Sequence, residues 1–145
     1  MSCVPVPRPV LEALEREATG RDLAPEALLL ELTERLVPEP ERPRVYLEAA
    51  VQTLDHALRD AREGRVVQAY LRAWTGLVLA IRSYCASRGV EPPSRPIDYW
   101  ALVERMSSEL GPDAYRAWFA GLAAYTAYKE GVRERGGVEV CVEEV

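Results

Sequence analysis

The sequence predicts an all-α fold: an antiparallel helical bundle with a short N-terminal helical pair. Two observations support this prediction. Apolar residues recur at helical spacing over most of the chain, and prolines stand where helices could begin while glycines stand where they could end. We expect a helical pair within residues 1–37, a bundle within 43–131 and a tail at 132–145. The 145 residues fit one compact domain with a substantial core.

The N-terminal pair is predicted from two short apolar repeats. The first helix covers about residues 8–19, and the second runs from 25 to about 37, before the proline-rich linker at 38–43. An extended Cys-Val-Pro-Val run precedes them, and this order resembles a ribbon-helix-helix DNA-binding unit. Only Ser2 and Arg8 offer polar side chains for reading bases. The likeness therefore implies the geometry of a helical hairpin without a base-reading surface.

The third and fourth helices are predicted at about residues 43–63 and 65–88, joined tightly at Gly64 into an antiparallel hairpin. The third helix has one apolar stripe, composed of Tyr46, Leu47, Ala50, Leu54, Ala57, Leu58 and Ala61. The fourth helix has a broader apolar face and is therefore predicted to lie at the centre of the bundle. That face comprises Val67, Tyr70, Leu71, Trp74, Leu77, Val78, Ile81, Tyr84 and Cys85.

Two further helices and a tail complete the chain. The fifth helix begins near Pro96 and ends at Gly111, and the sixth covers about residues 112–131. The sixth has a bulky face and a small face, and the small one permits close approach to the fourth helix or to a second subunit. We take Ala117, Gly121 and Ala124 on it as the candidate interface. The tail alternates apolar and charged residues, which predicts a strand or a disordered end.

The composition indicates where in the cell the protein is expected and which classes of binding partner are disfavoured. The formal net charge is −5, which argues against a general nucleic-acid binder. The three cysteines are odd in number and widely spaced, which favours neither disulfides nor a zinc cluster, although a Cys85 disulfide stays open. The chain has no membrane-spanning run and no leader-like start, so we expect a cytoplasmic protein. Abundant glutamate and scarce amides favour a thermophilic source.

Candidate chemistry is sparse, and each candidate has a competing structural interpretation. Arg65, Gln68, Arg72 and Arg82 share the polar side of the fourth helix and could bind an anion or nucleotide, or could pair with acids of the third helix. The only histidine, His56, precedes Asp60 by one helical turn on a face predicted to be exposed, where a surface pair is the expected role. We predict no catalytic residue, metal or cofactor.

One stretch resembles a known family. The residues are Tyr46-Leu-Glu-Ala-Ala, Leu54, Ala57-Leu58 and Glu63-Gly64, followed by Val67-Gln68-Ala69, Ala73-Trp74-Thr-Gly76 and Ala80-Ile81. Together with Tyr99-Trp100, Leu110-Gly111, Trp118 and Leu122, they resemble the archaeal PaREP family, the first-numbered of that name, over about residues 8–131. This family is similar to HEPN domains. The resemblance implies a HEPN-like bundle that dimerises. The tail of this sequence departs from the family pattern, in which further helix is expected there.

The same resemblance restricts the function that we expect. Many HEPN domains are ribonucleases that use an arginine and a histidine separated by four to six residues. The positions that would supply this arginine for His56 hold Ala49, Ala50 and Val51. We therefore predict a non-catalytic module that forms homo-oligomers, dimers above all, and binds a protein partner. The alternative is a nucleic-acid- or nucleotide-binding protein of toxin–antitoxin type without the ribonuclease motif.

Overall fold

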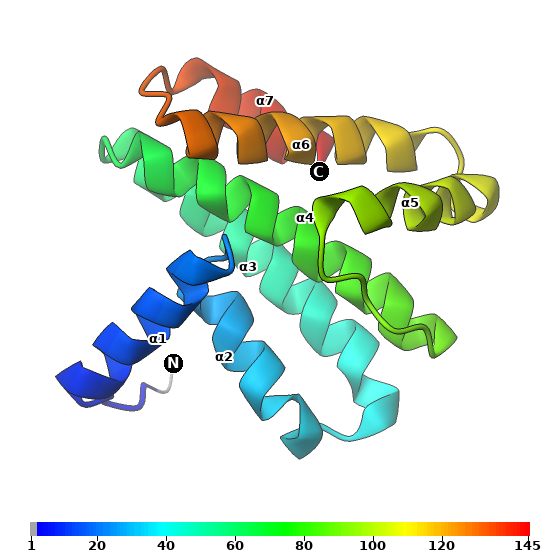
Figure 1. Cartoon of the computed structure of the whole chain (residues 1–145), viewed down its shortest axis with the longest axis horizontal. Coiled ribbons are helices and arrows are strands. Elements are labelled where there is room, and N and C mark those ends of the chain that lie inside the picture. Colours follow the sequence, from blue (N-terminus) through cyan, green and yellow to red (C-terminus); the bar gives the residue numbers. More distant parts are fainter. Residues whose placement is uncertain (1–2) are drawn as a thin grey trace.

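The computed structural model describes residues 3–145, and within them the chain is entirely helical, with no β-strand (Figure 1). The all-α prediction is confirmed. Residues 1 and 2 lie outside the described residues. They include Ser2 and part of the segment on which the expectation of no signal peptide depends. The α-helices are α1 (Arg8–Gly20), α2 (Pro25–Thr33), α3 (Arg42–Arg62), α4 (Val66–Arg88), α5 (Pro96–Leu110), α6 (Asp113–Glu130) and α7 (Gly136–Glu144). Two short 3-10 helices, Glu34–Leu36 and Glu39–Glu41, connect α2 to α3.

Helix α4 lies at the centre of the bundle (Figure 1). Helix α3 runs antiparallel beside it, and α6 and α7 pack on it from another side. The turn between α3 and α4 depends on Gly64, whose φ of 83° is the left-handed region that glycine adopts without strain. Most of the α4 surface is buried, including its small residues Ala69, Ala73 and Gly76. Such burial on several sides is why α4 carries so few polar residues.

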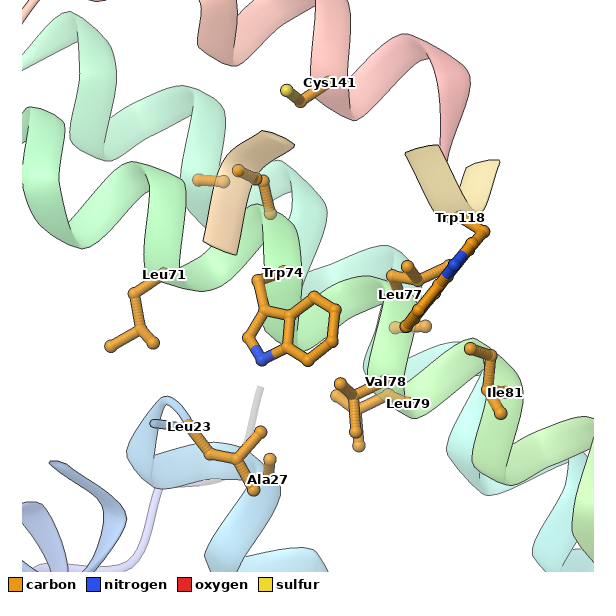
Figure 2. Close-up of a cluster of buried hydrophobic side chains, with 14 of the residues drawn as sticks. Leu23, Ala27, Leu71, Trp74, Leu77, Val78, Leu79, Ile81, Trp118 and Cys141 are labelled. Carbon is orange, nitrogen blue, oxygen red and sulfur yellow. The ribbon is translucent and has the colours of Figure 1, made fainter. Parts of the chain in front are cut away.

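The core gathers around one face of α4 (Figure 2). Figure 2 shows Trp74 and Val78 between Leu23 and Ala27 of the N-terminal pair on one side and Trp118 of α6 on the other. The rings of Trp74 and Trp118 are 5.9 Å apart, and Tyr99 of α5 stacks on Trp118 with centroids 5.6 Å apart. Aromatic pairs of this geometry stabilise a core beyond the area they bury.

The α3 stripe is buried along only part of its predicted width. Ala50 and Ala57 are fully covered, whereas Leu47 is 53% exposed and Leu54 is half-buried. Asp60, which the sequence placed on an exposed face, is completely buried. The pattern of α3 alone could not predict this burial, because Arg65 and Arg72, which pair with the carboxylate, belong to the start of α4.

The tail prediction was wrong, because residues 136–144 form helix α7. Its buried residues are Val138 and Cys141, three positions apart, and Val142 is partly covered, while Val140 is 60% exposed. This spacing is helical, so the apparent alternation over a few residues misled the prediction. The hydroxyl of Tyr70 on α4 donates a hydrogen bond of 2.7 Å to the carbonyl of Glu134, which fixes the entry to α7.

The N-terminal pair is attached to the bundle through α2. The backbone N–H of Ala24 donates a 3.0 Å hydrogen bond to the buried hydroxyl of Thr75, which itself donates to the carbonyl of Leu71. Ala27 joins the main core. Helix α1 makes its principal contacts with α2 alone and diverges from it beyond their turn (Figure 1). In residues 3–145, no helix is long and apolar enough to cross a membrane.

The closest approach of α6 to α4 gives a stability prediction. A Cβ built at Gly121 would lie 2.0 Å from Cδ2 of the buried Leu77 and 3.2 Å from its Cβ. Overpacking of this kind costs about 1–3 kcal/mol, which exceeds the roughly 1 kcal/mol that alanine gains over glycine in a helix. Gly121→Ala is therefore expected to lower the free energy of unfolding by about 1 kcal/mol in urea denaturation.

The matched control is Gly20→Ala at the end of α1, where no atom lies within 4 Å of the added Cβ. This change is expected to be neutral or slightly stabilising. Equal effects of the two substitutions would contradict the close packing of α6 on α4.

Candidate functional site

The arginines of the predicted anion site do not form one cluster. Arg65 and Arg72 meet at the start of α4, while Arg82 lies ten residues further along, about 15 Å away at the helical rise per residue. Gln68 is exposed and does not belong to the network of arginines and carboxylates around Asp60. The four residues therefore provide two separate sites, and these sites differ in how their charge is compensated.

The first site is built around the carboxylate of Asp60. Arg65 donates to Oδ1 through Nη2 at 2.8 Å, and Arg72 donates to Oδ2 through Nη1 at 2.7 Å. Arg72 also donates through Nε to Glu26 of α2 at 2.9 Å, and Arg65 pairs with Glu63 as well. Asp60 is fully buried, and both arginines pair with carboxylates of this chain, although the Arg65 side chain is half exposed. Their charge is used to connect α2, α3 and α4.

The pKa of Arg72 reflects this arrangement. Burial lowers it, but the hydrogen bonds and negative charges of Glu26 and Asp60 more than offset that effect, so the pKa lies above its ordinary value. His56 is at the edge of the network, with Nε2 3.5 Å from Asp60 Oδ1 and Nδ1 4.0 Å from Glu26 Oε1. No set of three or more residues able to hold a metal ion is found in the described part of the chain.

The second site contains Arg82, which the sequence grouped with the other arginines. Its side chain is only 12% exposed, and its nearest acid, Glu31, lies 3.8 Å from Nη2. Within residues 3–145, the buried Nε and Nη1 have no hydrogen-bond partner. Glu31 instead accepts a hydrogen bond of 3.3 Å from Arg21. Arg82 is thus a buried cation whose hydrogen bonds are incomplete.

The small face of α6 is directed toward this chain's own core. Gly121 and Ala124 are buried, and Gly121 packs against Leu77 of α4, while Ala117 is partly covered. The sequence allowed this face to pack either on the fourth helix or on a second subunit. In the structure it packs on the fourth helix. A surface for a second copy must then include other residues.

Two of the three thiols are in surroundings that do not suit a nucleophile, whereas Cys3 is exposed. Cys85 and Cys141 are buried, and burial raises the pKa of both thiols, which keeps them protonated near neutral pH. Cys3, Cys85 and Cys141 are all free, so no Cys85 disulfide forms within the chain. Cys85 is buried, as its predicted place on the apolar face of the fourth helix implies.

An apolar surface on the N-terminal pair is the main feature that sequence reasoning missed. On α1, Val10 and Leu11 are 49% and 44% exposed, and Leu14 shares their face within a sector of about 100°. Along α2 and the following 3-10 helix, Leu29, Leu32 and Leu36 are all exposed. Leu14 is half-buried. We use the name N-terminal apolar surface for these six residues, which lie on two helical segments that diverge (Figure 1). Their helical spacing was visible in the sequence, but their exposure was not.

Comparisons with known proteins add no assignment to this geometry. No family model matches the chain, and neither a curated protein nor a solved structure matches it.

The Asp60 network gives a second prediction. Asp60→Asn removes a buried charge and leaves Arg72 with a single carboxylate partner. Breaking a buried ion pair costs about 3 kcal/mol or more, so the free energy of unfolding should fall by about that amount. Glu17→Gln, in an exposed pair with Arg21, should cost less than about 1 kcal/mol. Similar losses in urea denaturation for both variants would contradict a structural role for Asp60.

Tyr46 gives a pH-dependent prediction. Burial, and then the nearby Glu34 carboxylate, raise its pKa to about 12, whereas an unfolded tyrosine ionises near pH 10. The resulting stabilisation is present below pH 10 and is lost as the pH rises toward 12, because the unfolded chain releases the proton first. Between pH 8 and pH 11, wild type should lose about 1 kcal/mol more stability than Tyr46→Phe. A constant difference in chemical denaturation at the two pH values would contradict this.

Proposed function

We propose that the chain is a non-catalytic helical module that self-associates as a homodimer through its N-terminal helical pair and then binds a protein partner. The N-terminal apolar surface is the observation that carries this proposal. Val10 and Leu11 are about half exposed although they follow the spacing of a buried helix face. Such a stripe is typical of a helix that packs against something.

The length of α1 supports this argument. A helix of 13 residues is marginally stable in water by itself, and most helices gain their stability from packing an apolar face. Ala18 is the only buried residue of α1 in the structure. A partner that covers Val10, Leu11 and Leu14 would supply the missing packing.

The residues before α1 favour a second copy as that partner. Residues 3–7 form neither helix nor strand, and the side chains of Val4 and Val6 are 83% and 51% exposed. In a strand, alternate residues direct their backbone groups to opposite edges, so Val4 and Val6 would offer one pairing edge while Pro5 and Pro7 occupy the other. Two copies could pair along the proline-free edge in a two-stranded antiparallel ribbon. This symmetric arrangement would cover the apolar stripes of both copies.

The bundle beneath this pair is proposed to be HEPN-like and to lack ribonuclease activity. Support comes from the order of its helices after residue 42 and from the resemblance described above, together with helix at the tail. The absence of an arginine at residues 49–51 and the buried carboxylate beside His56 support a structural role for that histidine. A role in binding nucleic acid or nucleotides through α4 is less favoured, since Arg65 and Arg72 already pair with carboxylates.

Light scattering and analytical ultracentrifugation across micromolar concentrations test the dimer. Wild type should be dimeric, and Leu11→Glu should raise the dissociation constant about a hundredfold or more. Each buried leucine contributes about 1.5–3 kcal/mol, and a symmetric interface contains it twice.

Ile97→Glu is the matched control, because Ile97 is a 67% exposed apolar residue on α5, outside the N-terminal apolar surface. It should leave the dimer intact. A wild type that stays monomeric at high micromolar concentration would remove the self-association proposal, and equal effects of the two substitutions would place the interface elsewhere.

A further inference from the structure

Two cavities meet at Arg82. One, of about 450 Å³, is lined by Trp74, Tyr99 and Tyr125. The other, of about 520 Å³, is lined by Tyr46 and several glutamates. Both share four lining residues from α2, α4 and the segment before α5, namely Glu31, Arg82, Pro93 and Ser94. We call the first the aromatic cavity and the second the acidic cavity.

The aromatic cavity brings aromatic rings together with four charged side chains, those of Arg21, Asp22, Glu31 and Arg82. Trp74, Val78 and Arg82 are spaced four residues apart and present one face of α4 to it. Tyr125 lies 5.0 Å from Trp74 and Tyr99 lies 6.2 Å from it, between ring centroids. Its volume is within the range of about 300–1,000 Å³ that is usual for ligand sites, and polar and apolar groups line it about equally.

Arg82 is the charged group of this cavity whose hydrogen bonds are incomplete. Asp22 accepts hydrogen bonds from Tyr125 and Lys129, at 3.3 and 3.2 Å. Glu31 is hydrogen-bonded to Arg21, so it contacts Arg82 only at 3.8 Å. A buried guanidinium with unpaired N–H groups is costly, and such a group in a native structure calls for a ligand, an ion or a water.

We propose that the aromatic cavity binds a small monocarboxylate with a flat aromatic body, and that Arg82 binds its carboxylate. The guanidinium of Arg82 has two edges with paired N–H groups, one formed by Nε and Nη2 and the other by Nη1 and Nη2. Either edge matches the two oxygens of a carboxylate. Nε and Nη1 are buried in the structure, so binding requires the Arg82 side chain to turn one of these edges toward the cavity. The ring of the ligand then packs against the parts of Trp74, Tyr99 and Tyr125 that line the cavity, because these rings already contact one another.

The charge around Arg82 favours a carboxylate over a phosphate. The aromatic cavity is neutral, because Arg21 and Arg82 balance Asp22 and Glu31. The adjoining acidic cavity has a formal charge of −2, from four glutamates against two arginines; these are Glu31, Glu34, Glu39, Glu91, Arg42 and Arg82. A phosphate dianion would be repelled by these acids more strongly than a monoanion would. This site is independent of the N-terminal apolar surface and goes beyond the proposed self-association.

Titration of the full chain with four probes tests the proposal by calorimetry and ligand-observed NMR. Benzoate should bind saturably. Benzamide, which has the ring without the charge, and acetate, which has the charge without the ring, should each bind at least about tenfold more weakly, since a charged hydrogen bond contributes about 1.5–3 kcal/mol. Phenyl phosphate should also bind more weakly than benzoate. No saturation by benzoate at millimolar concentration, or any probe binding as tightly as benzoate, would overturn the proposal.

Variants of the same helix locate the site. Arg82→Met should weaken benzoate binding about tenfold or more. Arg88→Met is the control, because Arg88 is on α4 but pairs with Glu109 and lines neither cavity. It should change affinity less than about twofold. Equal affinity of Arg82→Met and wild type would overturn the assignment. If circular dichroism shows that Arg82→Met does not fold, the wild-type comparison of benzoate with benzamide decides the question.

Discussion

The structure depends on the need to cover α4 on nearly every side. Its small residues Ala69, Ala73 and Gly76 let other helices approach closely, and its large residues Trp74, Leu77 and Ile81 fill the spaces between them. An apolar helix of this length cannot remain exposed to water. The positions of α3, α6, α7 and α2 follow from this requirement, since each buries part of the α4 surface.

Polar groups inside the bundle determine how the surrounding helices are connected. Asp60 joins α3 to α4 through two arginines, and Arg72 extends the connection to Glu26 of α2. Thr75 connects the same region to the backbone of Ala24. Buried polar groups stabilise a fold when their hydrogen bonds are complete. Arg82 differs from them, because its Nε and Nη1 have no partner among the described residues.

The sequence predicted the helices far better than it predicted the candidate sites. Proline and glycine positions gave the boundaries of most helices, and the broad apolar face of α4 indicated its central place. The tail was missed because the short alternation around Glu139 fits a strand by itself, while contacts with α4 and α6 favour helix. The burial of Asp60 and the incomplete pairing of Arg82 could not be predicted, since both depend on side chains that only the tertiary structure brings together. The stripe on α1 showed that a face needs covering without showing what covers it.

The contrast between α4 and α1 has a consequence for motion. Amide protons in the middle of α4 can reach water only when the surrounding helices separate, so their exchange with deuterium reports the global opening of the molecule. The amide protons of α1 are protected only by the backbone hydrogen bonds of an exposed helix. These bonds can open without disturbing the bundle. The chain therefore combines a central helix whose amides exchange slowly with a helix α1 whose order depends on the surface that packs against it.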